Sequence, residues 1–193
     1  MGNKVLVPLD GSELAEAALA YAERLNKALG WTVALLQVAQ PPSAHHGHGG
    51  NPLVEGSLQE LQDENAGGPR AYEEIRRREL AAMESLAGAE DRLRAAGVLA
   101  VREVGIGNPE EVIVERVAED DVAMIVLASH GRTGLARLFR GSVADAVVRL
   151  TARPTLVVRP FRDADQRVDL EHAEKLPQSD VDAVRRAMEL PAG

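Results

Sequence analysis

Residues 122–159 decide the fold of this chain, and they read VAMIVLASHGRTGLARLFRGSVADAVVRLTARPTLVVR. Two apolar runs without charge, Val122–Ala128 and Pro154–Val158, have the composition of strands that are buried on both faces, as in a parallel sheet. The loop between them ends at Gly141 and Ser142, where a segment of helical periodicity begins. This order predicts a unit in which a helix connects two parallel strands.

The same alternation extends toward the N-terminus. Ser12 is a suitable N-cap and Gly30 a suitable terminator for a first helix, and Asn108-Pro109 is a typical helix start. The chain is therefore predicted to be an α/β protein with a doubly wound, open, parallel five-stranded sheet and helices on both faces. Strands are expected at 4–9, 31–38, 98–104, 122–128 and 154–158, and a long helix at 71–96 with Tyr72, Ile75, Leu80, Met83, Leu86 and Leu93 inward.

Two segments depart from this alternation. Residues 39–70 are rich in glycine and proline and predict a loop insertion, with one short helix at 57–64. Its histidines, 45, 46 and 48, lack a fourth ligand at a defined spacing, so no metal site is expected. Residues 161–193 are polar and form a C-terminal extension with a short helix after Ser179. The domain itself is therefore expected to span residues 1–160.

Composition restricts the possible functions. The net charge of −8 and the small number of aromatic residues (two Phe, two Tyr and one Trp) argue against nucleic acid as a partner. The absence of cysteine excludes disulfides, thiolate metal ligands and thiol catalysis. No leader or membrane-spanning run is visible, so the protein is expected to be cytoplasmic and not to bind membranes.

The sequence also predicts an anion site. In doubly wound sheets, ligands bind at the carboxyl ends of the strands, which are here Leu9–Ser12, Val38 and Ala128–Gly131. A helix that starts at Gly141-Ser142 would direct free amides and the positive end of its dipole toward the same edge. Residues 128–160 also carry six arginines against one acid, which favours a bound anion.

These residues resemble the universal stress protein family. The resemblance rests on Pro8-Leu9-Asp10-Gly11-Ser12 after the first strand, and on Ser129-His130-Gly131-Arg132 with Gly141-Ser142 after the fourth. The nucleotide-binding branch of that family carries Gly-x2-Gly-x9-Gly-Ser/Thr. Gly131, Gly141 and Ser142 fit this spacing, whereas Ala128 occupies the position of the first glycine.

The resemblance implies a Rossmann-like fold of the adenine nucleotide alpha hydrolase type and a bound adenine nucleotide, ATP or else AMP or ADP. Magnesium, if bound, would be held mainly by the phosphates. Adenine would lie against the backbone near the ends of the first two strands, and Asp10 would face the ribose or a metal-bound water. The implied binding residues are Pro8, Leu9, Asp10, Val38, Ala128, Gly131, Arg132, Gly141, Ser142, Val143 and Ala144.

The resemblance further implies a regulatory role in stress response rather than catalysis, and the residues agree. Lysines occur only at 4, 27 and 175, so a phosphate-binding loop of the Walker type is absent. His130 is the single candidate base, and no catalytic residue is assigned. Two alternatives stay open: a slow ATPase, and a nucleotide-free dimeric interaction module of the same fold.

Two expectations concern parts outside the binding motif. The last strand, Pro154 to Val158, is apolar and would leave an open sheet edge, so a homodimer through this strand is expected, as the resemblance also implies. Residues 39–70 leave the second strand at the edge where adenine should lie. This insertion is therefore expected to act as a mobile flap beside the nucleotide.

Overall fold

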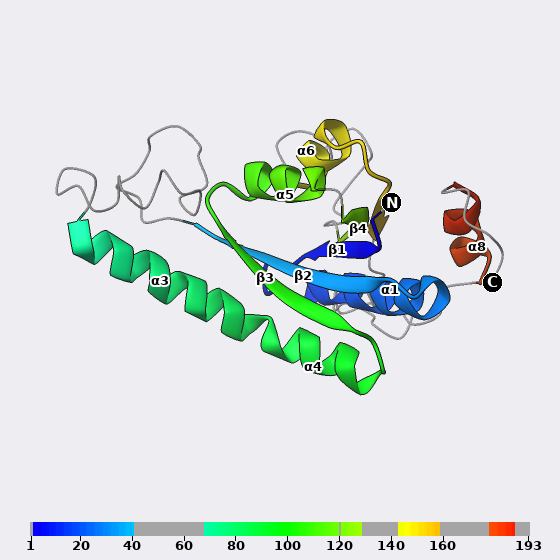
Figure 1. Cartoon of the computed structure of the whole chain (residues 1–193), viewed down its shortest axis with the longest axis horizontal. Helices are drawn as coiled ribbons and strands as arrows, with labels where there is room; N and C mark the ends of the chain where they lie inside the picture. Colours follow the sequence, from blue (N-terminus) through cyan, green and yellow to red (C-terminus); the bar gives the residue numbers. More distant parts are fainter. Residues whose placement is uncertain (1, 41–67, 120, 129–142, 159–177, 188–193) are drawn as a thin grey trace, which may run out of the picture.

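The computed structural model describes residues 2–40, 68–119, 121–128, 143–158 and 178–187. It contains one five-stranded, all-parallel sheet with the strand order β3-β2-β1-β4-β5 (Figure 1). The predicted fold class is therefore confirmed. The strands are β1 (Lys4–Pro8), β2 (Thr32–Ala39), β3 (Ala100–Ile106), β4 (Val122–Ala128) and β5 (Thr155–Val158).

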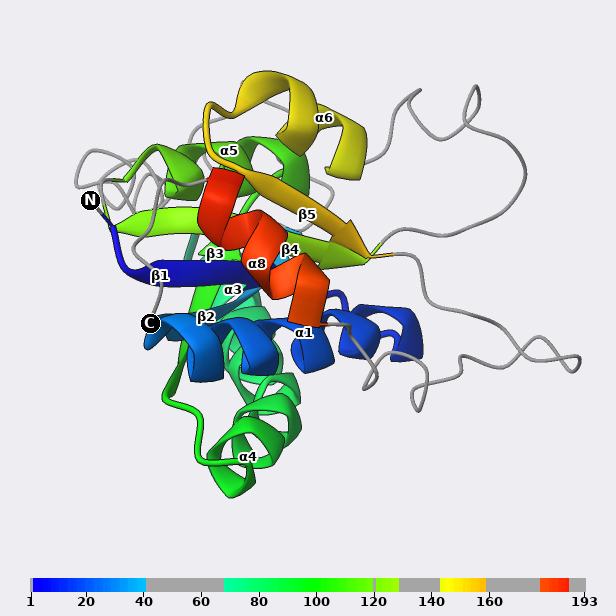
Figure 2. The ribbon, with the colours of Figure 1, turned by 90° about the vertical axis from the view of Figure 1, so that its right-hand side faces the viewer.

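Helices cover both faces of the sheet (Figures 1 and 2). One face carries α1 (Glu13–Leu29), α3 (Gly68–Ser85) and α4 (Ala87–Ala95), and the other carries α5 (Pro109–Ala118) and α6 (Val143–Leu150). A further helix, α8 (Gln178–Ala187), lies beside the C-terminal end of α1. Within the described ranges, no helix combines the length and the apolar composition that a membrane crossing requires.

The ends of α1 form as the sequence predicts. The Ser12 side chain accepts a hydrogen bond from the amide of Ala15, which satisfies one of the free amides at the helix start. At the other end, Gly30 adopts a left-handed conformation with φ of 70° and donates its N–H to the Asn26 carbonyl. Both caps are local, so they hold α1 in register against the strands on either side of it.

The helix expected at 71–96 is two helices, α3 and α4, which meet at Leu86. Of its predicted inward residues, Ile75, Leu86 and Leu93 are buried and Met83 is half-buried, but Tyr72 is 43% and Leu80 is 60% exposed. The first part of α3, which contains Tyr72, projects beyond the sheet (Figure 1). Leu80 follows the buried Ile75 and lies on a different side of the helix from Ile75 and Ala82. A single helical period applied to the whole segment therefore assigned the wrong inward face.

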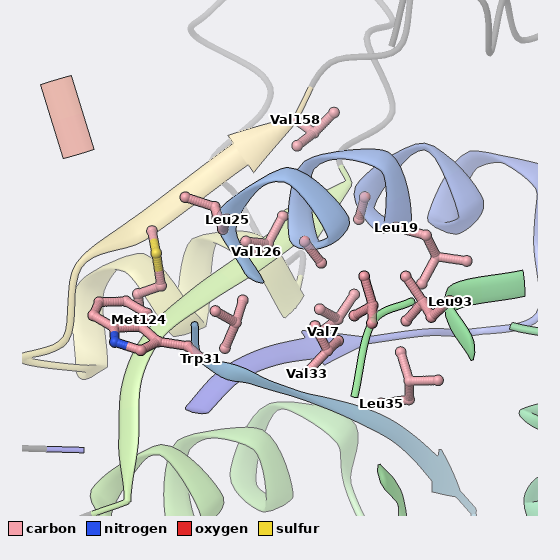
Figure 3. Close-up of a cluster of buried hydrophobic side chains, with 14 of the residues drawn as sticks. Val7, Leu19, Leu25, Trp31, Val33, Leu35, Leu93, Met124, Val126 and Val158 are labelled. Atoms are coloured by element: carbon pink, nitrogen blue, oxygen red, sulfur yellow. The ribbon is translucent and has the colours of Figure 1, made fainter. Parts of the chain in front are cut away.

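The core consists of two apolar layers, one on each face of the sheet. The layer on the α1 side is built around Val7, Val33, Leu35 and Val126, all fully buried (Figure 3). The layer on the other side packs Leu6 and Ile125, with other strand residues, against α5 and α6. Central strands that are apolar on both faces explain why the sequence reads as continuous apolar runs.

A charged network joins the strands to α5. The Arg116 guanidinium donates to the Glu103 carboxylate at 2.6 Å and 2.9 Å and to Asp121 at 2.9 Å. The Lys4 ammonium lies 2.6 Å from the Asp121 carboxylate. Hydrogen bonds from Arg116 and Lys4 hold the pKa of Asp121 at about 2, well below its ordinary value. Asp121 is therefore ionised at neutral pH, and the network links β1, β3 and β4 to α5.

We expect Gly105→Ala to destabilise the fold. A Cβ atom at position 105 would lie 2.3 Å from Cγ1 of Val112, because α5 packs closely on β3 at this point. Overpacking of this kind costs about 1–3 kcal/mol of unfolding free energy, measurable by urea denaturation. The control is Gly88→Ala in α4, where an added Cβ meets nothing within 4 Å and should be neutral or slightly stabilising. Equal stability of the two variants would contradict the prediction.

Candidate functional site at the carboxyl ends of the strands

The sheet has one topological switch point, between β1 and β4. From the end of β1 the chain enters α1 on one face, and α6, which precedes β5, lies on the opposite face (Figure 2). In open sheets of this kind, ligands bind in a crevice outside the carboxyl ends of the two strands at the switch point, so a crevice is expected here. The candidate site is this crevice, between the ends of β1, β2 and β4 and the start of α6.

The pairing of β1 with β4 ends before either strand does. The last paired residues are Leu6 and Ile125, although β1 continues to Pro8 and β4 to Ala128. The amide of Lys4 donates to the Asp121 carbonyl, on the β4 side, and successive amides in a strand point in alternate directions. Position 8 would therefore donate toward β4, but proline has no N–H, so Pro8 leaves the two strands unpaired at the crevice.

The end of β2 presents a donor and an acceptor to the same crevice. Thr32 donates its amide to Asn3 and Leu36 accepts from the Leu9 amide, so even-numbered residues of β2 direct their backbone groups toward β1. Val38 therefore directs both its N–H and its carbonyl toward β1. Among the described residues, backbone pairing between these strands ends with the bond from Leu9 to Leu36, 2.8 Å long. The N–H and carbonyl of Val38 therefore face the crevice, beyond the last hydrogen bond between β1 and β2.

This end of β2 is fixed from its other side. The Ala39 carbonyl accepts from the Gly107 amide at 3.0 Å, which extends the pairing with β3. The Arg78 guanidinium of α3 donates to the Gln40 carbonyl at 2.8 Å. Backbone groups held in this way are preorganised, because they need no rearrangement before they bind a ligand.

The loop after β1 is closed by its own side chains. Asp10 accepts hydrogen bonds from the Ser12 amide at 3.0 Å and from the Ser12 hydroxyl at 2.6 Å. Gly11 lies between them with φ of 79°, a conformation that favours glycine. The same serine hydroxyl caps α1, so it donates one hydrogen bond to Asp10 and accepts another from the Ala15 amide. Asp10 and Ser12 therefore shape the loop, and Ser12 also caps α1.

The start of α6 forms the other wall. Val143 and Ala144 lie in its first turn and are half-buried. Asp145, 3% exposed, is also in this turn and forms an ion pair with Arg149 one turn later. An acid so close to an anion site would oppose binding, and pairing with Arg149 reduces that effect.

Two of the six arginines between residues 128 and 160 do not lie near the expected anion site. Arg149 lies in the last turn of α6 and Arg153 follows that helix, where it donates to the Glu119 carbonyl at 3.5 Å. Both are at the end of α6 remote from the crevice, so the sequence interpretation that counted them toward the anion site was wrong on this point. His130, Gly131, Arg132, Gly141 and Ser142, together with Arg137 and Arg140, lie outside the described residues.

The structure describes seven of the eleven predicted binding residues. Pro8, Leu9, Val38, Ala128, Val143 and Ala144 are half-buried, Asp10 is exposed, and all seven lie at the carboxyl ends of the strands or the start of α6. Sequence reasoning missed the consequence of Pro8 and the direction of the Val38 backbone groups. The consequence of Pro8 could have been found from the sequence, because a proline at the end of a central strand cannot donate to the neighbouring strand. Within the described residues, no group of three or more acidic or histidine side chains is arranged to hold a metal.

A parallel sheet of this order, with helices on both faces and a switch point between β1 and β4, defines the class of doubly wound α/β proteins. Within that class the chain belongs to the universal stress protein family, whose model matches residues 1–159. The family match includes β1 to β5 and ends before α8.

Two relatives match this chain over nearly all of their own length. Universal stress protein MJ0577 of Methanocaldococcus jannaschii is 28% identical over 168 residues, which covers 82% of this chain and 96% of the relative. Universal stress protein YxiE of Bacillus subtilis is 28% identical over 161 residues, covering 82% of this chain and all of the relative (100%).

Solved structures agree with the fold. The structure of MJ0577 matches with a TM-score of 0.58 at 25% identity and covers 84% of this chain and 99% of its own. A universal stress protein in complex with cAMP matches with a TM-score of 0.55 at 21% identity, covering 82% and 97%. The protein of Archaeoglobus fulgidus in complex with dAMP matches with a TM-score of 0.52 at 18% identity, covering 82% and 97%. The last two likenesses show the fold alone.

Proposed function

We propose that the chain is a cytoplasmic regulatory protein of the stress response that binds ATP at the switch-point crevice. The observation that carries this proposal is the backbone of Val38, whose donor and acceptor face the crevice beyond the last rung of the β1–β2 ladder. The complexes of two structural neighbours with cAMP and dAMP are consistent with an adenine ligand.

The Val38 backbone suits adenine in particular. Adenine offers an amino donor at N6 beside an acceptor at N1, and these match a carbonyl and an N–H on one residue. Guanine offers an acceptor and a donor at the corresponding positions, so both hydrogen bonds would be lost and like groups would face each other. Each unpaired polar group buried in this way costs about 1–3 kcal/mol.

The phosphates belong on the α6 side of the crevice in this proposal. Val143 and Ala144 begin α6, so their amides are among those without a helical partner. Gly141 and Ser142 precede them, and Arg132 follows β4 in the sequence. Free amides, a helix dipole and an arginine are the usual components of a phosphate site. Magnesium, when bound, would be held mainly by the phosphate oxygens.

We expect the full chain to bind ATP more tightly than GTP by at least about tenfold, because guanine mispairs with Val38. Isothermal titration calorimetry with each nucleotide and magnesium measures the difference. ITP is the control, because its base has the same carbonyl and N–H as guanine but lacks the 2-amino group. It should bind as weakly as GTP. Equal affinity for ATP and ITP would contradict recognition by the Val38 backbone.

Turnover is expected to be absent or very slow. Ser12 is engaged in the loop and the helix cap, and the chain has no lysine from residue 28 to residue 174. Positive charge placed beside bound phosphates, without an oriented water, stabilises the ground state and does not accelerate hydrolysis. We therefore expect less than about one ATP hydrolysed per minute at pH 7.5 with magnesium. Faster hydrolysis that His130→Ala abolishes, without loss of ATP affinity, would identify an ATPase instead.

The homodimer through β5 is also proposed, because the two edges of the sheet differ. The β3 edge carries Arg102 and Glu103, and charges on an edge strand oppose pairing with another chain. The β5 edge has none, and its residues Thr155, Leu156 and Val157 are only half-buried. Val148 and Leu150, 41% and 67% exposed, add apolar surface on the adjoining α6. A second copy paired along β5 would cover this surface.

The backbone direction of β5 permits that pairing. The Pro154 carbonyl accepts from Ile125 of β4, so even-numbered residues of β5 face β4 and odd-numbered ones face outward. Thr155 and Val157 therefore offer their N–H and carbonyl groups to a partner strand. Val158 is 2% exposed, so a charged substitution there would disrupt the core before it tested an interface.

A nucleotide-free interaction module is the second candidate, and Ala128 favours it. This residue is half-buried at the end of β4, where its Cβ adds bulk at a position that the nucleotide-binding motif fills with glycine. Purified protein that is denatured and analysed by chromatography for released nucleotide distinguishes the two. An adenine nucleotide in the supernatant supports the ATP-binding function. A nucleotide-free protein that also fails to bind ATP supports the module.

A further inference from the structure

The helix α8 lies outside the part of the chain that matches the family. The family match ends at residue 159, and α8 spans Gln178–Ala187. It is nevertheless packed on the domain: Figure 2 shows it in front of β4 and β5, between β5 and α1. This is also the side of the sheet on which β5 is the edge strand.

Two side chains anchor α8. Val184 is half-buried and packs against the apolar layer on the α1 side, which includes Leu25, Met124 and Val158 (Figure 3). Arg185 donates from Nη2 to the Ala28 carbonyl in the last turn of α1. A cation at a helix C-terminus interacts favourably with the helix dipole and satisfies a carbonyl that has no partner within the helix.

The attachment is nevertheless weak. The buried Nε of Arg185 finds no hydrogen-bond partner in the described parts of the chain, and an unpaired buried donor opposes docking. A helix of ten residues is also marginal in water on its own, so α8 should fold only while it is docked. Docked and released states of α8 are therefore close in free energy, which is what a reversible contact requires.

The position of α8 affects what can pair with β5. When two copies of β5 pair antiparallel, the two-fold axis is perpendicular to the sheet, and the second copy brings its own α8 to the same side of the joined sheet. Paired strands lie about 4.8 Å apart, whereas two packed helices need about 8–10 Å between their axes. The two α8 helices would therefore compete for the space beside the axis.

We propose that α8 is a C-terminal strap that restrains the pairing of β5 with a second copy of this chain. The proposal rests on the β5 homodimer proposed above. When α8 is docked, self-association is weakened. When α8 is released, the side of β5 toward α1 is free and the dimer becomes tighter. The strap is thus an intramolecular control on the oligomeric state.

The test uses the full chain with Val184→Asp, which places a charge in the apolar contact. Ala183→Asp is the matched control, because residue 183 is exposed on the same helix. Arg185→Ala is a second way to release α8 without adding a charge. Hydrogen exchange should show loss of protection in α8 by about tenfold or more for Val184→Asp and Arg185→Ala, with β1 and β4 unchanged.

Sedimentation velocity over a concentration series then decides the proposal. A dimer dissociation constant lowered by about tenfold or more in Val184→Asp and Arg185→Ala, but not in Ala183→Asp, supports the strap. Addition of Val157→Pro, which removes an outward N–H of β5, should reverse the gain. Unchanged or weaker dimerisation of the released variants overturns the strap and leaves the β5 dimer standing. If every protein is monomeric, both the strap and the β5 dimer are overturned.

Discussion

Gly141→Val is expected to lower the affinity for ATP by about a hundredfold or more. Residue 141 lies two positions before the start of α6, where the proposed phosphate site places its free amides. A branched side chain there would obstruct the approach of the phosphates to the backbone. Loss of two charge-assisted hydrogen bonds, at about 1.5–3 kcal/mol each, accounts for this magnitude. Calorimetry with ATP and magnesium measures it.

The control for this variant is adenosine, which carries the base and ribose but no phosphate. Its binding, followed by ligand-observed NMR, should be the same for Gly141→Val and the unaltered chain. Gly141→Ala, with its smaller side chain, should give an intermediate loss of ATP affinity. Wild-type ATP affinity in Gly141→Val would place the phosphates elsewhere, and loss of adenosine binding would mean that the substitution disturbs the whole crevice.

The fold was predictable because its signals are local. Ser12 and Gly30 end α1 through hydrogen bonds to residues three or four positions away, so the sequence shows both partners. The uncharged run of β4 marks a central strand for a similar reason, since burial on both faces requires apolar residues at every position. The resemblance placed residues 154–158 at an edge of the sheet, and this position is confirmed.

The errors arose where packing depends on distant parts of the chain. Leu80 is exposed although Ile75 and Ala82 of the same helix are buried, so its burial depends on which side of α3 meets the sheet, and that is set by residues distant in the sequence. Likewise, Arg149 counted toward the basic segment, but it lies in the last turn of α6 and its guanidinium pairs with Asp145 one turn earlier. Net charge along a sequence does not distinguish a paired cation from one that faces a ligand.

The candidate site also combines local features, which the sequence shows, with features that depend on distant residues. Its residue types were visible, but their use depends on the sheet register. Pro8 opens the crevice only because its amide position faces β4, and Val38 offers a base-recognition pair only because β1 ends before it. Both facts follow from which residues pair across strands, and the sequence contains no direct signal of register. The flap expected at 39–70 lies largely outside the described residues and stays a prediction.

Val157→Pro should convert the expected dimer into a monomer. Residue 157 directs its N–H away from β4, so proline there removes a donor from the open edge and leaves the pairing of β5 with β4 intact. Two-fold symmetry doubles the loss, because each copy contributes the same position. Two lost hydrogen bonds, two carbonyls left unpaired and the bulk of the rings together cost about 3 kcal/mol, or about a hundredfold in the dissociation constant.

Val157→Ala is the matched control, because alanine shortens the same side chain but keeps the N–H. It should remain dimeric in light scattering at concentrations where Val157→Pro is monomeric. Thermal melting should show that the proline variant is still folded, since residue 157 is on an edge strand and only half-buried. If the proline and alanine variants dimerise equally, the interface lies elsewhere. The next surface to test is then the exposed Val148 and Leu150 of α6, because a backbone change at β5 leaves their apolar area intact.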